Sequence, residues 1–556
     1  MPPKRKDILK PKGKAPAKNI PQTENDFLED ADDHEQAAGK WRAGDVAKAT
    51  RFFKRAIEVY DEGLKRFPGS FDLAYNKAVL EYNLTQDDRI LPHLGPRIAL
   101  LEETLKSHQT ALSLSPDSNT DILFNTAQVL TSFAEAVLDA RTQQTAKVSA
   151  RALLEEAVGL FTKCLGLQQE EYERVRLEIE ALKAYAAGEE HAQQELPQAG
   201  TTRGGMDEDF EITSTTSSAP GEWATIEEPL TPETILETCT AQLGALTTLL
   251  GLYDPSEAAN IETRVQNGLA TGTMVIPTLI NLIQDSPFKK EEENISGPTL
   301  SIGSPISSEE LETTPKDDAL LAVATFQAAL AELQYKASQI TSTQYATTIE
   351  TVFVNITQPT QTEEQRSAYM NAVSAYADAL IDLASAVCDS PAYGPTSSTH
   401  TTDQEVQWTS LTHAQKLLTQ LSTAPHSTLL PPSRLADTFL ARGDVELFRF
   451  HLSFSPSAKP AWVNAKSVLV GNAGVYYRGA RTYAEKAGKA DVRETADAKA
   501  LVAEVMKEVN VAGGVIGVPK EAWKKRSGGV KRVLEQMVEE GILGREEAEG
   551  VLNLLN

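Results

Sequence analysis

The chain has 556 residues, and its 53 Lys and Arg against 78 Asp and Glu give a formal net charge of −25. This length exceeds one ordinary compact core, so we expect several domains or an array of repeats that pack on their neighbours. The charge argues against direct nucleic-acid binding, which needs an excess of cations, and it suits a soluble protein with a basic partner. Three cysteines scattered along the sequence predict neither a disulfide framework nor a zinc site. No apolar stretch is long enough to span a bilayer, and we expect no membrane association.

Residues 1–35 are predicted to form a disordered tail whose charge changes sign along its length. Residues 1–20 hold seven Lys or Arg against one Asp, with several prolines that prevent regular structure, whereas residues 24–35 hold seven acids in twelve positions. The basic part can be interpreted as a nuclear-import signal, as a nucleic-acid contact or as a solvated tail. The first interpretation predicts a protein of both the cytoplasm and the nucleus. The import signal would consist of Lys4, Arg5, Lys6, Lys10, Lys12 and Lys14.

Helices are predicted from residue 36 onward, because apolar residues recur at spacings of three and four. Residues 36–187 form one helical pattern after another, with separators such as Gly44–Asp45 and Pro68–Gly69. Residues 188–233 hold eleven Asp or Glu and one Arg, and we predict an acidic disordered insertion there. Beyond it we expect helical repeats over 234–284, a disordered polar loop over 285–318, irregular helical repeats over 319–510 and capping helices over 511–556.

One residue pattern recurs along the predicted helices: Ala, then an aromatic residue four positions on, then a small residue three further. Two clear copies are Ala49–Phe53–Ala56 and Ala157–Phe161–Cys164. Positions i, i+4 and i+7 lie on one helix face, so the small residues let a neighbouring helix approach while the aromatic ring fills the gap. The five triads begin at Ala49, Ala157, Ala322, Ala372 and Ala473, and Thr104, His108 and Ala111 form a degenerate copy.

The stretch AAGKWRAGDVAKATRFFKRAIEVY, followed by SFDLAYNKAVLEY, resembles the tetratricopeptide (TPR) repeat, a pair of antiparallel helices of about 34 residues. The resemblance is strongest over 36–187 and weaker over 230–510. It departs from the family where the second helix continues past the usual proline. The resemblance implies an all-α fold, a TPR-like antiparallel helix-pair superhelix (α-solenoid) with long disordered insertions. A generic helical bundle is the alternative.

The TPR resemblance also suggests where a partner would bind, because the first helices of TPR pairs line a groove that takes up peptides. Residues of this chain on such helices are Lys40, Tyr75, Asn76, Asn125 and Gln128. Nucleotide-binding, metal-binding and nucleophile motifs are absent from the sequence, so we expect no cofactor, no metal and no catalysis.

The acidic insertion offers a second way to hold a basic client. Asp207, Glu208, Asp209 and Glu211 surround Phe210, which would add apolar capture to charge attraction. The alternative is that the insertion is a tolerated loop without a partner.

Together these features predict a non-enzymatic adaptor or dedicated chaperone that holds a basic client protein in a helical groove. The chain is similar in kind to TPR assembly chaperones, including fungal ones, that escort a newly made ribosomal protein, and to TPR histone chaperones with an acidic insertion. One alternative is a scaffold subunit of a multiprotein complex. Another is a co-chaperone that docks on heat-shock chaperone tails through Lys40, Lys48, Arg51, Asn76 and Lys77.

Overall fold

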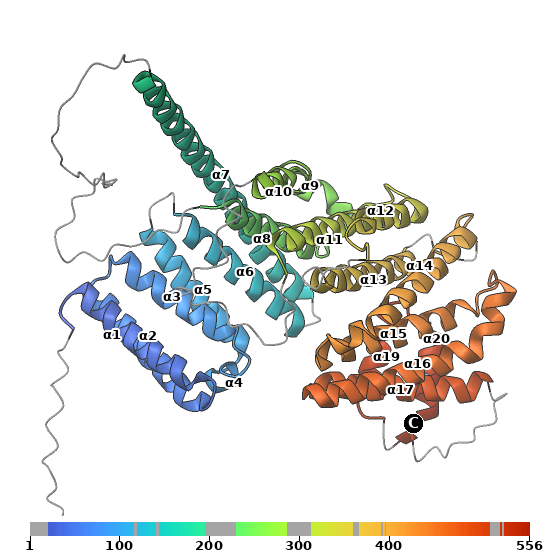
Figure 1. The fold of residues 1–556 in the computed structure, drawn as a ribbon. Helices are drawn as coiled ribbons and strands as arrows, with labels where there is room; N and C mark the ends of the chain where they lie inside the picture. Colours follow the sequence, from blue (N-terminus) through green and yellow to red (C-terminus); the bar gives the residue numbers. More distant parts are fainter. Residues whose placement is uncertain are drawn as a thin grey trace, which may run out of the picture. The chain divides into compact units, whose positions relative to one another are not determined.

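The computed structural model describes residues 21–115, 119–140, 144–194, 230–285, 313–359, 366–390, 393–394, 396–511, 523–524 and 527–555. Every regular element in these ranges is a helix and none is a β-strand (Figure 1), which confirms the predicted all-α fold. Helices that follow one another in the sequence pack in neighbouring pairs, as a helix-pair array requires. Over the same ranges, no helix is both long and apolar enough to cross a bilayer.

The chain divides into two compact units. Unit 1 comprises residues 1–156 and 300–307, and unit 2 comprises residues 157–299 and 308–556. Helix α7 (Gln144–Gln194) starts in unit 1 and continues in unit 2. Unit 1 also contains α1 (Glu24–Arg42), α2 (Val46–Arg66), α3 (Phe71–Thr85), α4 (Leu91–Leu94), α5 (Arg97–Leu114) and α6 (Thr120–Ala140).

Helix α1 begins at Glu24, within the predicted tail. A capping box starts it: the Thr23 hydroxyl accepts the backbone N–H of Asp26, and the Asp26 carboxylate accepts the N–H of Thr23 at 2.9 Å. Phe27 is buried in the core of unit 1, so the helix gains apolar contacts from its first turn. The prediction of disorder was therefore wrong for residues 24–35, because the cap and the buried face outweigh the local charge.

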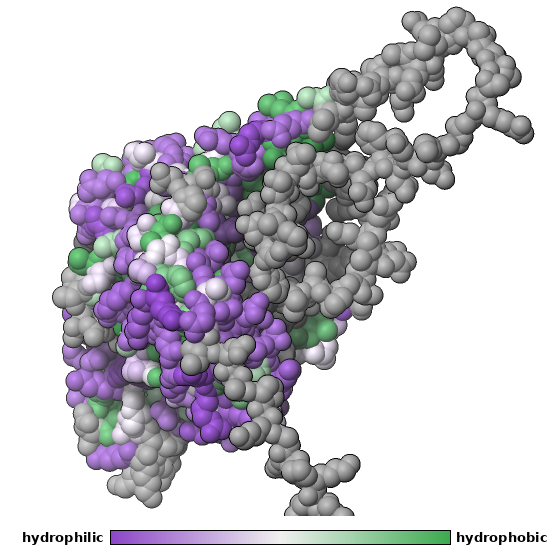
Figure 2. All heavy atoms as spheres, turned by 90° about the vertical axis from the view of Figure 1, so that its left-hand side faces the viewer, coloured by the Kyte–Doolittle hydropathy of each residue, from purple (hydrophilic) through white to green (hydrophobic). Residues whose placement is uncertain are grey.

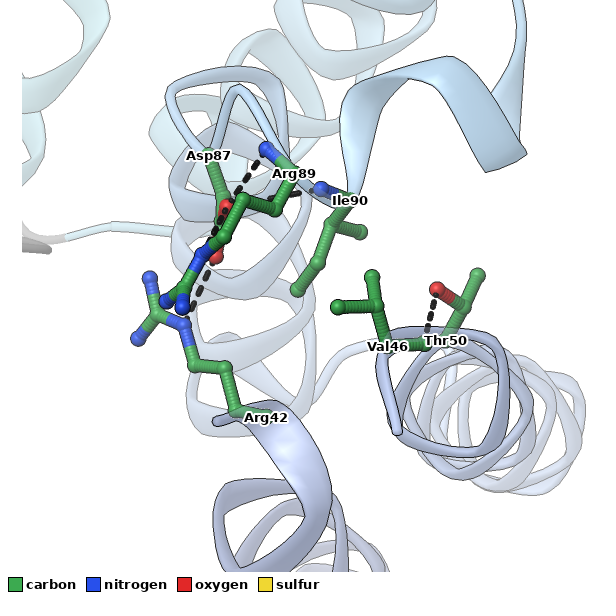
Figure 3. Close-up of polar contacts among 6 residues, drawn as sticks. All are labelled: Arg42, Val46, Thr50, Asp87, Arg89 and Ile90. Carbon is green, nitrogen blue, oxygen red and sulfur yellow. Dashed lines mark hydrogen bonds and ion pairs between the residues drawn. The ribbon is translucent and has the colours of Figure 1, made fainter. Parts of the chain in front are cut away.

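A buried carboxylate joins the end of α1 to the turn after α3 (Figure 3). Asp87 Oδ2 accepts a hydrogen bond from Arg42 Nε at 2.7 Å. Asp87 Oδ1 accepts the backbone N–H of Arg89 at 2.9 Å and that of Ile90 at 3.3 Å. Burial alone would raise the pKa of Asp87, but the Arg89 N–H and the Arg42 guanidinium outweigh it and lower that pKa. Asp87 thus fixes how the first helix pair meets the second.

Unit 2 holds the rest of α7 and a longer series of helices. They are α8 (Pro232–Leu250), η1 (Pro255–Glu257), α9 (Ala258–Ala270), η2 (Thr271–Val275), α10 (Ile276–Asp285), α11 (Pro315–Lys336), α12 (Ser342–Val354), α13 (Arg366–Asp389), α14 (His400–Leu421), η5 (His426–Thr428), α15 (Pro432–Leu452), α16 (Pro460–Ala487), α17 (Ala490–Val511), α19 (Val530–Glu539) and α20 (Arg545–Leu555). Helix α8 packs on α11, α13 on α14, α15 on α16, and α16 on α17.

Helices occupy the edges of both predicted insertions. Helix α7 runs on to Gln194, and α8 and α11 start at Pro232 and Pro315 behind the capping hydroxyls of Thr231 and Thr314. Proline at the first helical position and a capping threonine are strong start signals, which explains these shifted boundaries. Residues 195–229 and 286–312 lie outside the described residues, so their predicted disorder stays a prediction.

The repeat triads are packing positions, as predicted. Ala329 alone among the members of the five triads is half-buried. The buried members are Ala49, Phe53, Ala56, Ala157, Phe161, Cys164, Ala322, Phe326, Ala372, Tyr376, Ala379, Ala473, Tyr477 and Ala480.

Two of the aromatic rings occupy space that a glycine leaves on another helix. A Cβ atom on Gly443 would lie 2.3 Å from the ring of Tyr477, and one on Gly268 would lie 2.8 Å from the ring of Phe326. Real Cβ atoms do not approach rings this closely, so α15 and α16 can reach their observed separation only with glycine at position 443. In these two cases, the aromatic ring of the triad therefore requires a glycine on the facing helix, and the spacing within the triad does not predict that glycine.

Candidate functional site

Two of the five predicted groove residues meet in unit 1. Asn125 Nδ2 on α6 donates a hydrogen bond to the Tyr75 hydroxyl on α3 at 2.9 Å. The ring of Phe71 stacks on that of Tyr75, with centroids 5.4 Å apart. Burial, together with the charge of Asp121, raises the pKa of Tyr75 to about 12, so its hydroxyl stays protonated at neutral pH. These two residues hold α3 and α6 side by side, and they use part of their hydrogen-bonding capacity within the fold.

The other three predicted groove residues occupy separate positions. Lys40 is exposed in the last turn of α1, Asn76 is exposed on α3, and Gln128 is half-buried on α6. Lys77, one of the residues considered for heat-shock chaperone docking, binds the Asp61 carboxylate at 2.7 Å. The ammonium group of Lys77 is thus already in an ion pair within the same unit. The client-binding role of the five groove residues stays a prediction.

The two charged segments singled out in the sequence lie outside the described residues. The basic tail holds Lys4, Arg5, Lys6, Lys10, Lys12 and Lys14, and the acidic insertion holds Asp207, Glu208, Asp209 and Glu211. Their roles in import and client binding stay predictions.

The structure brings together a further charged surface in unit 2, which sequence reasoning did not identify. Carboxylates from three elements form it: one on α11, three on α13 and one at the C-terminal cap of α19. The three on α13 share one helix face, because they stand at positions i, i+4 and i+11. We call this surface the α13 carboxylate cluster and define it as Glu332, Asp378, Asp382, Asp389 and Glu540.

The carboxylates of this cluster repel one another and are partly desolvated. Burial, followed by the negative charges of Glu332 and Asp378, raises the pKa of Asp382 to about 7. Burial also raises the pKa of Asp378 to about 6, although the nearby Arg434 guanidinium opposes the shift. Asp378 and Asp382 are nevertheless exposed at the surface. Protein therefore displaces part of the water around these carboxyl groups while leaving them open to a partner.

The cations near the cluster are already engaged within the fold. Lys336 Nζ lies 2.5 Å from a carboxylate oxygen of Glu332. An Arg434 N–H donates to the side-chain oxygen of Asn371 at 2.6 Å. An additional cation from outside would relieve the repulsion among the carboxylates, so the surface is suited to lysine or arginine side chains of a partner.

Two histidines of the described residues take part in packing and in contacts between helices. Among the described residues, no group of three or more His, Cys, Asp or Glu side chains is arranged to hold a metal ion. His108 is fully buried, its Nδ1 lies 3.0 Å from the Thr104 carbonyl, and burial lowers the pKa of His108. His451 Nδ1 lies 2.7 Å from the Glu547 carboxylate and joins α15 to α20.

Comparisons with known proteins show that this chain has only limited similarity to any of those described here. No protein-family model matches the sequence. A stretch of 131 residues is 34% identical to UPF0656 protein C926.02 of Schizosaccharomyces pombe, and it covers 24% of this chain and 28% of that protein. A solved circular tandem repeat protein with a novel repeat topology and enhanced subunit contact surfaces aligns over 96% of this chain and 92% of its own, at 12% identity and a TM-score of 0.31. That overlap is too loose to define a common fold, so the observed helix pairs themselves carry the architectural conclusion.

Proposed function

We propose that this protein is a non-enzymatic adaptor or dedicated chaperone that binds a basic client protein, and that the α13 carboxylate cluster holds part of the client's positive charge. The observation that supports this best is the gathering of carboxylates from α11, α13 and the C-terminal cap of α19, with Asp378 and Asp382 exposed among them. Burial and the neighbouring negative charges raise the pKa of Asp382 to about 7. A lysine or arginine side chain placed there would relieve the repulsion among the carboxylates. The packed helix pairs form a rigid surface that holds the carboxylates of this cluster in place.

A ribosomal protein and a histone are the two client classes that we put forward. Both are strongly cationic, and the net charge of −25 favours association with either. In this proposal, the acidic residues at 207–211 add further negative charge, and the basic residues at 4–14 direct nuclear import.

The test is affinity purification of the tagged full-length protein, followed by mass spectrometry of the proteins that co-purify. The variant Asp378→Lys/Asp382→Lys reverses charge at the cluster. A matched control is Asp33→Lys/Glu62→Lys, which makes the same change in net charge at exposed positions of unit 1. We expect a ribosomal protein or a histone with the unmodified protein and with the control, and a loss of about tenfold or more with the cluster variant.

Two results would contradict the proposal. If neither a ribosomal protein nor a histone is recovered, the proposal of a basic client of these classes is wrong. If the cluster variant and the control recover the client equally, the α13 carboxylate cluster is not the client's binding site. A single large assembly of partners without excess positive charge would favour the scaffold alternative instead.

A further inference from the structure

An open apolar groove lies on unit 2, between α7 and the continuous segment formed by η2 and α10. Its volume is about 390 Å³. The buried side chains of Ile235 on α8 and Leu279 on α10 are among its lining residues. Tyr172 lines it from α7, and Met274 lines it from η2. None of its lining residues belongs to the α13 carboxylate cluster.

Buried hydrogen bonds fix the walls of the groove relative to one another. The Gln242 amide on α8 donates to the Thr162 hydroxyl on α7 at 3.0 Å. The side-chain oxygen of Gln242 accepts the Thr271 hydroxyl of η2 at 2.8 Å. Gln242 is 1% exposed, and burying its amide is tolerated because both ends are satisfied. The three elements around the groove are thus held in place before any partner arrives, which lowers the entropic cost of binding.

The apolar surface extends from the groove along α7, which runs on past its neighbours in unit 2 (Figure 1). Met274 is 68% exposed, the highest value among the large hydrophobic side chains that the structure describes. On α7, Ile179 is 46% exposed. Ile179 stands seven residues after Tyr172 and therefore continues the helix face that lines the groove. Figure 2 shows that hydrophilic residues dominate the face in view and that hydrophobic surface interrupts it in patches. Exposed apolar side chains such as Met274 and Ile179, beside an open apolar groove, are typical of a surface that binds a partner.

Negative charge borders this apolar surface. Glu173 lines the groove from α7, and Glu180 stands seven residues after it on the same helix face. Arg176, which lines the groove, lies 2.7 Å from the Glu173 carboxylate, and Arg174 is paired with Glu171. Arg176 Nη1 also lies 3.8 Å from a Glu180 carboxylate oxygen, so one guanidinium faces two carboxylates and the remaining charge on this face is negative.

From this combination we propose that the groove docks an amphipathic helix of a partner protein, with lysine or arginine residues beside its apolar stripe. An apolar stripe at spacings of three and four would fill the space between α7 and α10, in the helix-in-groove mode of recognition. Cationic flanks would meet the glutamates of the rim. An anionic membrane surface would be repelled by the same glutamates. A small molecule would find few convergent polar groups in this open and mainly apolar groove.

The experiment measures fluorescence anisotropy of a labelled, designed peptide of about five helical turns with a leucine stripe and lysine flanks, titrated with the full-length protein. We expect Met274→Asp to weaken binding about tenfold or more and Met274→Leu to preserve it. Because Met274 is largely exposed, we expect neither change to disturb the fold. The matched control is Val468→Asp, which adds the same charge at a valine on α16 that is 59% exposed, and we expect it to bind like the unmodified protein.

Other outcomes would overturn the proposal. They are absence of peptide binding, equal affinity of Met274→Asp, equal affinity for a scrambled peptide of the same composition, and equal affinity for a peptide with glutamate flanks. Sedimentation analysis adds one more: a dimer that Met274→Asp converts to a monomer would make a second copy of the chain the occupant. The variant Asp378→Lys/Asp382→Lys is expected to bind the peptide normally, so failure of the proposed client function and failure of this groove are distinguishable.

Discussion

Asp444 and Asp382 belong to the same unit, yet their carboxylates have opposite surroundings: one is paired with a lysine, and the other is close to further carboxylates. Asp444 accepts hydrogen bonds from Lys499 Nζ at 2.8 and 2.9 Å and from the Tyr477 hydroxyl at 2.8 Å. Lys499 is 2% exposed, so this is a closed ionic contact among α15, α16 and α17. Asp382 instead lies at the surface among other carboxylates, and its pKa is raised to about 7.

The contrast separates charges that hold the fold from charges that can serve a partner. A buried carboxylate needs its own cation, because desolvation without compensation is costly. An exposed carboxylate beside like charges tolerates its position, since water screens the repulsion, and it gains when a cation arrives. Mutating the two sites should therefore give different results: loss of stability at Asp444, and loss of binding with little change in stability at Asp382.

The largest expected effect on stability follows from Lys499→Met. The substitution keeps a long side chain but leaves the Asp444 carboxylate with the Tyr477 hydroxyl as its remaining donor from this contact. Removing one partner of a buried pair costs about 3–5 kcal/mol of unfolding free energy, and we expect about 3 kcal/mol because the Asp444 side chain is 15% exposed. Urea unfolding followed by tryptophan fluorescence would measure it.

The double variant Lys499→Met/Asp444→Asn is the control for that measurement. It removes the isolated charge, so it should regain a large part of the lost stability. A loss below about 1 kcal/mol in the single variant would show that the Lys499–Asp444 contact does not carry the structural role assigned to it.

A smaller effect is expected at the paired carboxylate of unit 1. Arg42→Leu removes one donor to Asp87, which keeps the N–H groups of Arg89 and Ile90, so we expect a loss of about 1–2 kcal/mol. The folded-state pKa of Asp87 is lowered, so the stability that it contributes is present above the unfolded-state value near 3.8 and is lost as the pH falls below it. Chemical unfolding at neutral and acidic pH would show a reduced acid dependence in the variant.

Arg89→Leu provides the matched control for Arg42→Leu. Arg89 Nε lies 3.8 Å from the same carboxylate but its side chain is 59% exposed. Its replacement should change stability by less than about 0.5 kcal/mol, because exposed ion pairs contribute little. Equal losses in the two variants would contradict the assignment of Arg42 as the structural partner.

Much of the fold could be predicted because local sequence determines it. The spacing in Ala49–Phe53–Ala56 fixes which helix face is buried, and the other triads repeat that rule. The start of α1 was missed because seven acids in residues 24–35 concealed a capping box at Thr23. The fit of Tyr477 against Gly443 was also invisible, since it depends on how two helices meet rather than on either helix alone.

The candidate site was less predictable, because it forms between distant segments. The spacing of Asp378, Asp382 and Asp389 within one predicted helix was an available signal for an acidic face. Glu332 and Glu540 join that face only through packing of α11 and α19, which no local pattern encodes. Conversely, Tyr75 and Asn125 were selected from the sequence as groove residues, and the structure adds that they bind each other across fifty positions.

Apart from the controls, the smallest expected effect on stability concerns Asp382→Asn and depends on pH. In the folded protein the pKa of Asp382 is raised to about 7 from an ordinary 3.8, so the folded state binds more protons between these values. The contribution of this group to stability is therefore fully present below about pH 3.8 and is lost as the pH rises from there through about 7. Because water reaches the side chain, we expect less than about 1 kcal/mol in total.

Thermal unfolding at about pH 5 and about pH 8 would measure this dependence, with Asp33→Asn on the exposed face of α1 as the control. The asparagine variant at position 382 should match the unmodified protein at acidic pH and exceed its stability at alkaline pH, whereas the control should show no such gain. A difference independent of pH would mean that repulsion does not act on Asp382. The cluster would then have no stored unfavourable charge for a basic client to relieve, and the proposed mode of binding would lose its physical basis even if a client were found.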